Sequence, residues 1–150
     1  MLDVEALRSE FPSLAGPQIF LDGPAGTQVP SRVIGAVGDA LIRSMSNVGG
    51  DFGSSRRSEM TVAAARSAAS DLVGGRSDEV VFGPNMTSLT FALSRALAEE
   101  WKPGDRVVLS GLDHDANITP WVRAAAAVGA EVVFANVTPT AGLDTEHMLS

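Results

Sequence analysis

Hydrophobic and polar positions in the second half of the chain alternate in blocks that predict strands and helices in regular succession. Continuous apolar runs at 79–82, 106–110 and 131–135 (EVVF, RVVLS and EVVFA) predict three buried strands. Helical spacing at 86–100 and 118–128 predicts a helix in each gap between them. The order β-α-β-α-β favours an α/β fold with a mostly parallel sheet, because parallel strands need such crossovers.

Both of these helices are expected to begin with an asparagine cap. Asn85 can cap the first helix, in which Leu89, Leu93 and Leu97 share one apolar face. Asn117 can cap the second helix in the same way. Each helix start therefore follows closely on a predicted strand.

The first half of the chain has a less regular pattern. It predicts a short helix at 3–11, a short strand at 18–22 (QIFLD) and further helices at 31–44 and 59–73. The glycine-rich stretch NVGGDFGSS (47–55) is expected to form a loop between the last two helices.

Composition then restricts the class of protein. Of 150 residues, 45% are hydrophobic and 19% charged, which suits one packed domain better than a disordered chain. The net charge of −7 argues against a nucleic acid or an anionic membrane as the main partner. No cysteine is present, so disulfides, thiolate metal sites and cysteine nucleophiles are excluded within these residues. A soluble cytoplasmic protein is expected.

The last residues suggest that the protein continues. The stretch GLDTEHMLS begins a helix, capped by Asp144 or Thr145, that stops after about one turn. A single turn is unstable alone, and three parallel strands would leave open sheet edges. We therefore expect these residues to be the N-terminal part of a longer protein.

Two strand-to-helix junctions are expected to lie side by side at the edge of the sheet where the parallel strands end. Ligands of parallel sheets bind beyond these carboxyl ends. In the first, FGPNMTS (82–88), the N–H groups of Met86, Thr87 and Ser88 can bind an anion. An ordinary helix start capped by Asn85 explains the same residues. Neither a Walker loop nor a dinucleotide fingerprint is present, which argues against a nucleotide-binding module.

The second junction, SGLDHDAN (110–117), contains His114. An imidazole there can stack on a flat heteroaromatic ring or transfer protons near neutral pH. The alternative is an ordinary loop histidine held by Asp113 or Asp115. No metal site is expected, because three adjacent residues are not spaced to converge on one ion.

Two further stretches carry candidate contacts. GPAGT (23–27) brings backbone close to a ligand, or forms an ordinary turn. In SSRR (54–57), Arg56 and Arg57 suggest an anion contact or a subunit-interface contact, or else a solvated helix start.

Taken together, FLDGPAGTQVP, VVFGPNMTSLTFALSRAL and GDRVVLSGLDHDANITPW, in this order and spacing, resemble the class V aminotransferase family of pyridoxal 5'-phosphate (PLP) enzymes, and within it the cysteine desulfurase-like branch. The resemblance implies the fold-type I architecture: a large domain with a mostly parallel sheet, a small domain, and a homodimer with active sites at the interface. Residues 1–28 would form an N-terminal segment bordering the active site, and residues 29–150 the first part of the large PLP-binding domain.

The resemblance also implies roles for single residues. His114 matches the histidine that stacks on the pyridine ring of the cofactor. Asn85, Met86 and Thr87 match the loop that holds the cofactor phosphate, where desulfurases commonly have Gly-Thr-Thr.

Other matched positions concern the substrate. Ala25, Gly26 and Thr27 match a loop near the substrate pocket. The glycine-rich loop lacks the histidines and arginine that desulfurases often have there, and Arg56 or Arg57 is a candidate to replace the lost charge.

No catalytic residue is expected within these residues. A PLP enzyme needs a Schiff-base lysine and an acid beside the pyridine nitrogen. The single lysine, Lys102, precedes the 106–110 strand and so lies at the wrong edge of the sheet; the catalytic lysine is expected beyond residue 150. The parent protein is expected to act on an amino acid by desulfuration, transamination, epimerisation or another lyase step. The alternative is a non-catalytic relative, or an inactive fragment that acts only as a folding or binding module.

Overall fold

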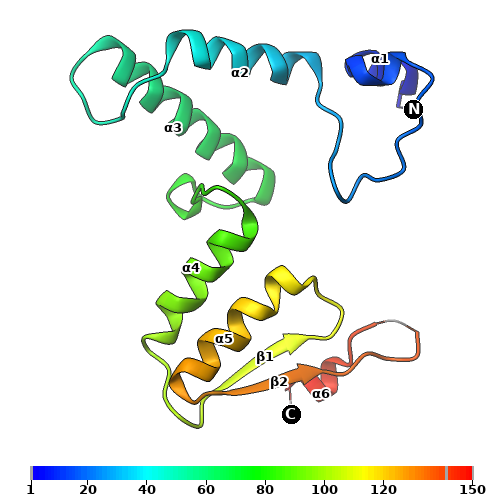
Figure 1. Ribbon diagram of the computed structural model, residues 1–150, viewed down its shortest axis with the longest axis vertical. Helices are drawn as coiled ribbons and strands as arrows, with labels where there is room; N and C mark the ends of the chain where they lie inside the picture. Colours follow the sequence, from blue (N-terminus) through cyan, green and yellow to red (C-terminus); the bar gives the residue numbers. More distant parts are fainter. Residues whose placement is uncertain (1, 141, 150) are drawn as a thin grey trace. The chain divides into compact units, whose positions relative to one another are not determined.

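The computed structural model describes residues 2–140 and 142–149 (Figure 1). They belong to two compact units, with the boundary between Val81 and Phe82. In the part of the chain that is described, no helix is both long enough and apolar enough to cross a membrane.

The regular elements of the first unit are all helices among its described residues, and loops connect them. Its elements are α1 (Val4–Ser9), η1 (Pro12–Ala15), α2 (Ser31–Arg43), α3 (Gly53–Val73) and η2 (Ser77–Glu79), where η denotes a 3-10 helix. Helix α1 contacts η1, and α3 contacts both α2 and η2. The expected strand at 18–22 is not formed, since these residues adopt no regular structure and pair with no other strand.

Helix α3 begins at Gly53 rather than at Glu59, because the preceding loop is bonded to its first turns. The buried hydroxyl of Ser55 accepts a hydrogen bond from the Gly50 N–H (2.8 Å) and donates one to the Asn47 carbonyl (2.6 Å). The Glu59 carboxylate accepts another from the Gly49 N–H at 3.0 Å. The glycine-rich loop is therefore shorter than expected, and its fold is tied to the helix.

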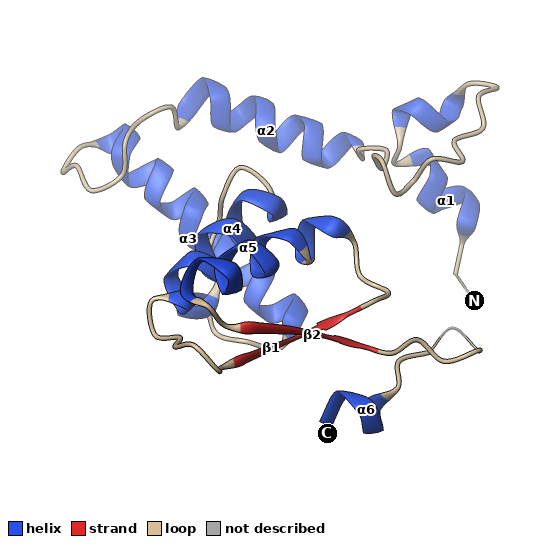
Figure 2. Cartoon of the chain, turned by 60° about the horizontal axis from the view of Figure 1, so that its bottom comes forward, coloured by secondary structure: helices blue, strands red, loops and turns tan. Residues whose placement is uncertain are grey.

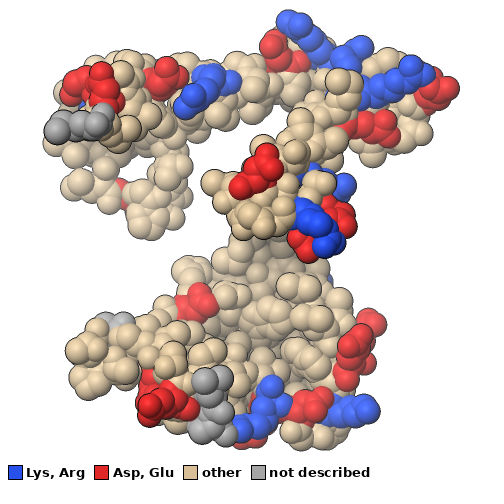
Figure 3. Space-filling view, turned by 180° about the vertical axis from the view of Figure 1, so that it is seen from behind, with Lys and Arg blue, Asp and Glu red and all other residues tan. Residues whose placement is uncertain are grey.

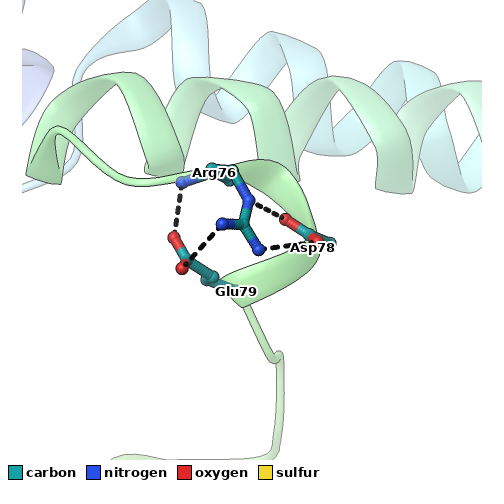
Figure 4. Close-up of polar contacts among 3 residues, drawn as sticks. All are labelled: Arg76, Asp78 and Glu79. Carbon is teal, nitrogen blue, oxygen red and sulfur yellow. Dashed lines mark hydrogen bonds and ion pairs between the residues drawn. The ribbon is translucent and has the colours of Figure 1, made fainter.

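Residue Glu79 ends the 3-10 helix η2 instead of starting the expected strand at 79–82. Its carboxylate accepts a hydrogen bond from the backbone N–H of Arg76 at 2.8 Å, and its own N–H donates to the Arg76 carbonyl at 3.0 Å. The Arg76 guanidinium also binds both carboxylate oxygens of Asp78, each at 3.0 Å (Figure 4). Residues 80–82 then have no strand beside them among the described residues, so the strand expectation is wrong here.

The second unit contains a two-stranded parallel sheet and its helices. Its elements are α4 (Met86–Ala98), β1 (Arg106–Ser110), η3 (Asp115–Asn117), α5 (Thr119–Val128), β2 (Glu131–Ala135) and α6 (Thr145–Leu149). The strands pair in register from Arg106 opposite Glu131 to Ser110 opposite Ala135. Helix α5 connects them and packs on β2, while α6 contacts β2 from the other side of the sheet (Figure 2). Both strands span the residues expected from the sequence.

Helices α4 and α5 pack against each other through small side chains. The buried residues are Thr90, Ser94 and Ala98 on α4, and Pro120, Ala124 and Ala125 on α5. The Thr90 hydroxyl donates to the Met86 carbonyl within its own helix at 3.0 Å, so its burial leaves no unsatisfied donor. Small side chains let the two helix backbones approach closely.

The apolar face of α4 that carries the leucines is largely exposed among the described residues. Leu93 is 53% exposed and Leu97 is 44% exposed. The buried face instead follows the small residues, one position further along the helix. Leu89, Leu93 and Leu97 do share one face of α4, but the face buried among the described residues is the adjacent one with the small side chains.

Few apolar side chains of the described residues are buried. They are Ala98, Leu109, Ala124, Ala125 and Ala135. Large apolar side chains such as Leu21, Ile42 and Leu72 are mostly exposed. On the face seen in Figure 3, charged side chains stand in small groups with broad uncharged areas between them. Apolar surface of this extent is characteristic of protein that contacts other protein.

Candidate functional site

The two helix starts expected to form the site belong to the second unit. Helix α4 contacts η3, the 3-10 helix that directly follows His114. In Figure 1, α4 and α5 both run from this end of the unit back toward the turn that precedes β1. The helix that begins at the first junction, α4, is therefore in contact with η3, the element that follows the His114 loop.

The start of α4 is capped by Asn85, as expected. Its side-chain oxygen accepts a hydrogen bond from the Ser88 N–H at 2.8 Å, and its carbonyl accepts one from Leu89 at 3.2 Å. The Ser88 N–H is thus occupied and is not available to an anion. Among the described residues, the N–H groups of Met86 and Thr87 have no acceptor, so these two remain for a ligand.

Gly83, two residues before the cap, lies close to the Leu89 side chain of α4. A Cβ atom placed on Gly83 would lie 2.6 Å from Cδ2 and 2.7 Å from Cγ of Leu89, which is too close for either atom. A side chain at position 83 would therefore require the Leu89 side chain to move. The sequence showed the glycine but not the reason for it.

The ring of His114 caps the 3-10 helix that follows it. Its Nδ1 atom accepts a hydrogen bond from the Ala116 N–H at 3.1 Å, and its carbonyl accepts one from the Asn117 N–H at 2.8 Å. The His114 N–H donates to the Asp113 carboxylate at 2.8 Å. Asp115 is engaged elsewhere, since it accepts a hydrogen bond from the Thr119 hydroxyl at 2.6 Å. The side chain of His114 is exposed, with Nδ1 fixed by its own loop.

The expected role of Asn117 as the cap of α5 is wrong. The residue lies in η3, and the residue that precedes α5 is Ile118, which makes no side-chain cap. The Asn117 amide instead donates to the Asp113 carboxylate at 2.6 Å and accepts from the Trp121 indole N–H at 3.1 Å. Sequence reasoning missed Trp121. The available signal was the four-residue spacing of Asp113, Asn117 and Trp121, which is about one helical turn.

A hollow of about 330 Å³ lies beside this loop within the second unit. Its lining consists of residues 107–110 of β1, Trp101, Asp113, Asn117 and Trp121. The bonded side chains of the loop therefore border an open space next to β1.

The residues expected near the substrate lie in the first unit. The N–H groups of Ala25 and Gly26 donate to the Asp22 carbonyl at 3.2 and 3.3 Å, which forms a turn. Both residues line a hollow of about 400 Å³ together with residues 18–22. Thr27 is exposed directly after the turn. Their contact with a substrate stays a prediction.

Both arginines of the SSRR stretch have partners inside the first unit. Arg56 forms an ion pair with Asp51. Nε of Arg57 donates to the Arg43 carbonyl at 2.7 Å, where it satisfies an otherwise free carbonyl at the end of α2. An anion or interface contact of either arginine stays a prediction.

The only lysine lies at the other end of β1 from the candidate site. Lys102 belongs to an exposed turn in which its N–H donates to the Asp105 carboxylate at 2.7 Å. A five-residue strand spans about 13 Å, so Lys102 and His114 are separated by at least the length of β1. The described residues contain no group of three or more side chains that could bind a metal ion.

Comparison with solved structures defines the fold of this chain. The cysteine desulfurase of Thermococcus onnurineus superimposes on 98% of the chain with a TM-score of 0.89 and 24% sequence identity. The chain covers 37% of that protein. The described residues thus have the fold of part of a cysteine desulfurase, which is a fold-type I structure.

Sequence comparison identifies the family. The Aminotransferase class-V family matches residues 19–150, so the chain belongs to this family of PLP-dependent enzymes. An uncharacterized protein of Mycobacterium tuberculosis is 38% identical over 90% of the chain and 34% of its own length. A probable cysteine desulfurase of Halobacterium salinarum is 33% identical over 97% of the chain and 37% of its own length. The chain therefore spans about a third of the length of these relatives.

Proposed function

We propose that these residues form the part of a PLP-dependent enzyme that holds the phosphate and the ring of the cofactor. The observation that carries the proposal is the contact between α4 and η3. It joins the helix whose first turn has two N–H groups without an acceptor to the element that His114 caps. A phosphorylated ring needs both features: donors for an anion and a flat side chain for its face.

The groups present suit the cofactor. The N–H groups of Met86 and Thr87 point along the start of α4, where the helix dipole favours an anion, and the exposed Thr87 hydroxyl is a further donor. Asn85 would hold this turn in shape through its bond to Ser88. The exposed His114 ring would cover a face of the pyridine. When bound, PLP supplies an electron sink for chemistry at the α-carbon of an amino acid.

The reaction of the complete protein is a proposal that rests on family membership. We propose an amino-acid substrate, with desulfuration or transamination as the two reactions to test first, since relatives include proteins named as cysteine desulfurases. Ala25, Gly26 and Thr27 would border the substrate, and Arg56 or Arg57 would contact an anion or a second subunit. We also propose a cytoplasmic homodimer, and the exposed apolar surface supports an association of this kind.

Spectroscopy of the protein encoded by the complete open reading frame tests the proposal. After expression with added PLP, we expect a visible absorbance band that disappears on borohydride treatment, with the label on one lysine other than Lys102. A colourless protein that takes up no PLP would contradict the proposal and favour a non-catalytic relative. Assays for sulfide release and for amino-group transfer would then separate the two candidate reactions.

A further inference from the structure

The Asp113, Asn117 and Trp121 side chains form a continuous set of hydrogen bonds around the base of the His114 loop. One oxygen of Asp113 accepts from the His114 N–H and the other accepts from the Asn117 amide. The Asn117 oxygen accepts from the Trp121 indole N–H. The loop is thereby joined to α5, which packs on β2 and on α4.

Asparagine is the side chain that suits this position. A carboxylate only accepts hydrogen bonds, and an indole N–H only donates them, so the residue between them must do both. The amide of Asn117 does so over 2.6 and 3.1 Å. An aspartate there would face the Asp113 carboxylate with a second negative charge, and an alanine would leave the Trp121 indole N–H and one Asp113 oxygen without this partner.

The same loop geometry decides which nitrogen of the imidazole holds the proton. Nδ1 of His114 accepts the Ala116 N–H, so Nδ1 is unprotonated and the proton of the neutral ring is on Nε2. This bond requires the Ala116 N–H to stay within hydrogen-bond distance of the His114 ring. Asn117, the residue directly after Ala116, is held in turn by its side-chain bonds to Asp113 and Trp121.

We propose that Asn117 is a positioning residue, which holds the loop of residues 113–116 against Trp121 and so keeps His114 as the tautomer protonated on Nε2. Its benefit to cofactor binding rests on the proposed function, whereas the tautomer itself does not. The ring would meet the cofactor in one orientation, with Nε2–H free as a donor.

Nitrogen NMR of the complete protein, labelled with ¹⁵N in histidine, tests this inference without PLP. At a pH where the ring is neutral, the His114 signals, assigned with His114→Gln, are expected to show an unprotonated Nδ1 and a protonated Nε2. In Asn117→Ala the two shifts are expected to move toward each other as the tautomers exchange. Trp121→Phe, which removes only the indole N–H from the bond set, is expected to move them in the same direction by less.

A matched control lies in the same turn. Thr119→Val removes the bond to Asp115 and leaves the Asn117 bonds in place, so the His114 shifts are expected to stay as in the wild type. Unchanged shifts in both Asn117→Ala and Trp121→Phe would overturn the inference, and Trp121→Phe decides alone if Asn117→Ala does not fold.

A PLP titration of the same proteins separates the inference from the proposed function. The dissociation constant is expected to rise about 2–12-fold in Asn117→Ala, the equivalent of one neutral hydrogen bond. A changed tautomer in a protein that never binds PLP would contradict the proposed function alone. Unchanged His114 shifts in variants that bind PLP normally would contradict the positioning role alone.

Discussion

The side-chain oxygen of Asn85 lies 2.8 Å from the backbone nitrogen of Ser88 and closes the first turn of α4. This bond satisfies one of the N–H groups that a helix start leaves free. It also defines which N–H groups remain available, namely those of Met86 and Thr87. Asn85 is therefore expected to act on a bound anion through the shape of the turn.

Removing this cap should weaken α4. Asn85→Ala is expected to lower the free energy of unfolding by about 1 kcal/mol, because the Ser88 N–H loses its acceptor. Asn85→Asp is the matched control and should keep most of the stability, since aspartate caps equally well. Chemical denaturation followed by circular dichroism measures both. Equal loss in the two variants would show that the cap is not the cause.

Replacing His114 should weaken the binding of PLP by the complete protein. A stacked aromatic pair is worth about 0.5–1.5 kcal/mol beyond its buried area, so His114→Ala is expected to raise the dissociation constant about 2–12-fold. His114→Phe keeps a flat ring and should retain most of the affinity. Fluorescence titration with PLP distinguishes the variants. Wild-type affinity in His114→Ala would rule out stacking.

The hydroxyl of Ser55 should control the order of the glycine-rich loop. Ser55→Ala would leave the Gly50 N–H and the Asn47 carbonyl without their partner, at a cost of about 1–3 kcal/mol. Hydrogen exchange at the Gly50 amide is expected to accelerate. Ser54→Ala, at the neighbouring partly exposed position, serves as the control and should leave that exchange rate unchanged. Slow exchange in Ser55→Ala would contradict the assigned bond.

A side chain at position 83 should disturb the entry into α4. Gly83→Ala is expected to destabilise the protein by about 1–3 kcal/mol, because its Cβ would overlap the Leu89 side chain. Leu89→Ala removes the overlapping atoms, so the double variant should lose less stability than the sum of the single variants. Denaturation of all four proteins gives the coupling. Strict additivity would mean that Leu89 simply rotates away.

The stability of η2 is expected to depend on pH through the ionisation of Asp78. The hydrogen bonds from the Arg76 guanidinium lower the pKa of Asp78 below its ordinary value. The folded value is therefore lower than the unfolded value of about 3.9, so the pair stabilises the fold above that pH and the effect is lost as pH falls through the folded value. Carbon NMR titration should show the Asp78 pKa rising in Arg76→Gln. Arg66→Gln, which changes the charge equally on α3, should leave it unmoved.

The parts of the fold that depend on local pattern were predictable. Strands β1 and β2 match the expected ranges because each is a continuous apolar run next to a turn. The expected strand at 79–82 has the same pattern, but Glu79 ends η2 through its bonds with Arg76, and residues 80–82 have no strand beside them among the described residues. Apolar character predicts burial, whereas a strand also needs a neighbour to bond with.

In the candidate site too, some features follow from local sequence pattern and others depend on contacts formed in the fold. The cap by Asn85 follows from residue type and position, and the sequence predicted it. Asn117 lies in the 3-10 helix η3, before α5 begins, and does not cap α5. From this position its side chain bonds to Trp121. The combined hydrogen bonds of several side chains determine such a turn, so no single residue type in the sequence predicts it.

The close packing of α4 on α5 has a consequence for molecular recognition. Because their buried side chains are small, the two helices have little room to slide, and the ends they present to a ligand are expected to move together. A molecule that engages both ends would find them already assembled, and little conformational entropy would be lost on binding. Enlarging Ala124 in this contact would then impair ligand capture from a distance, without touching any atom of the ligand.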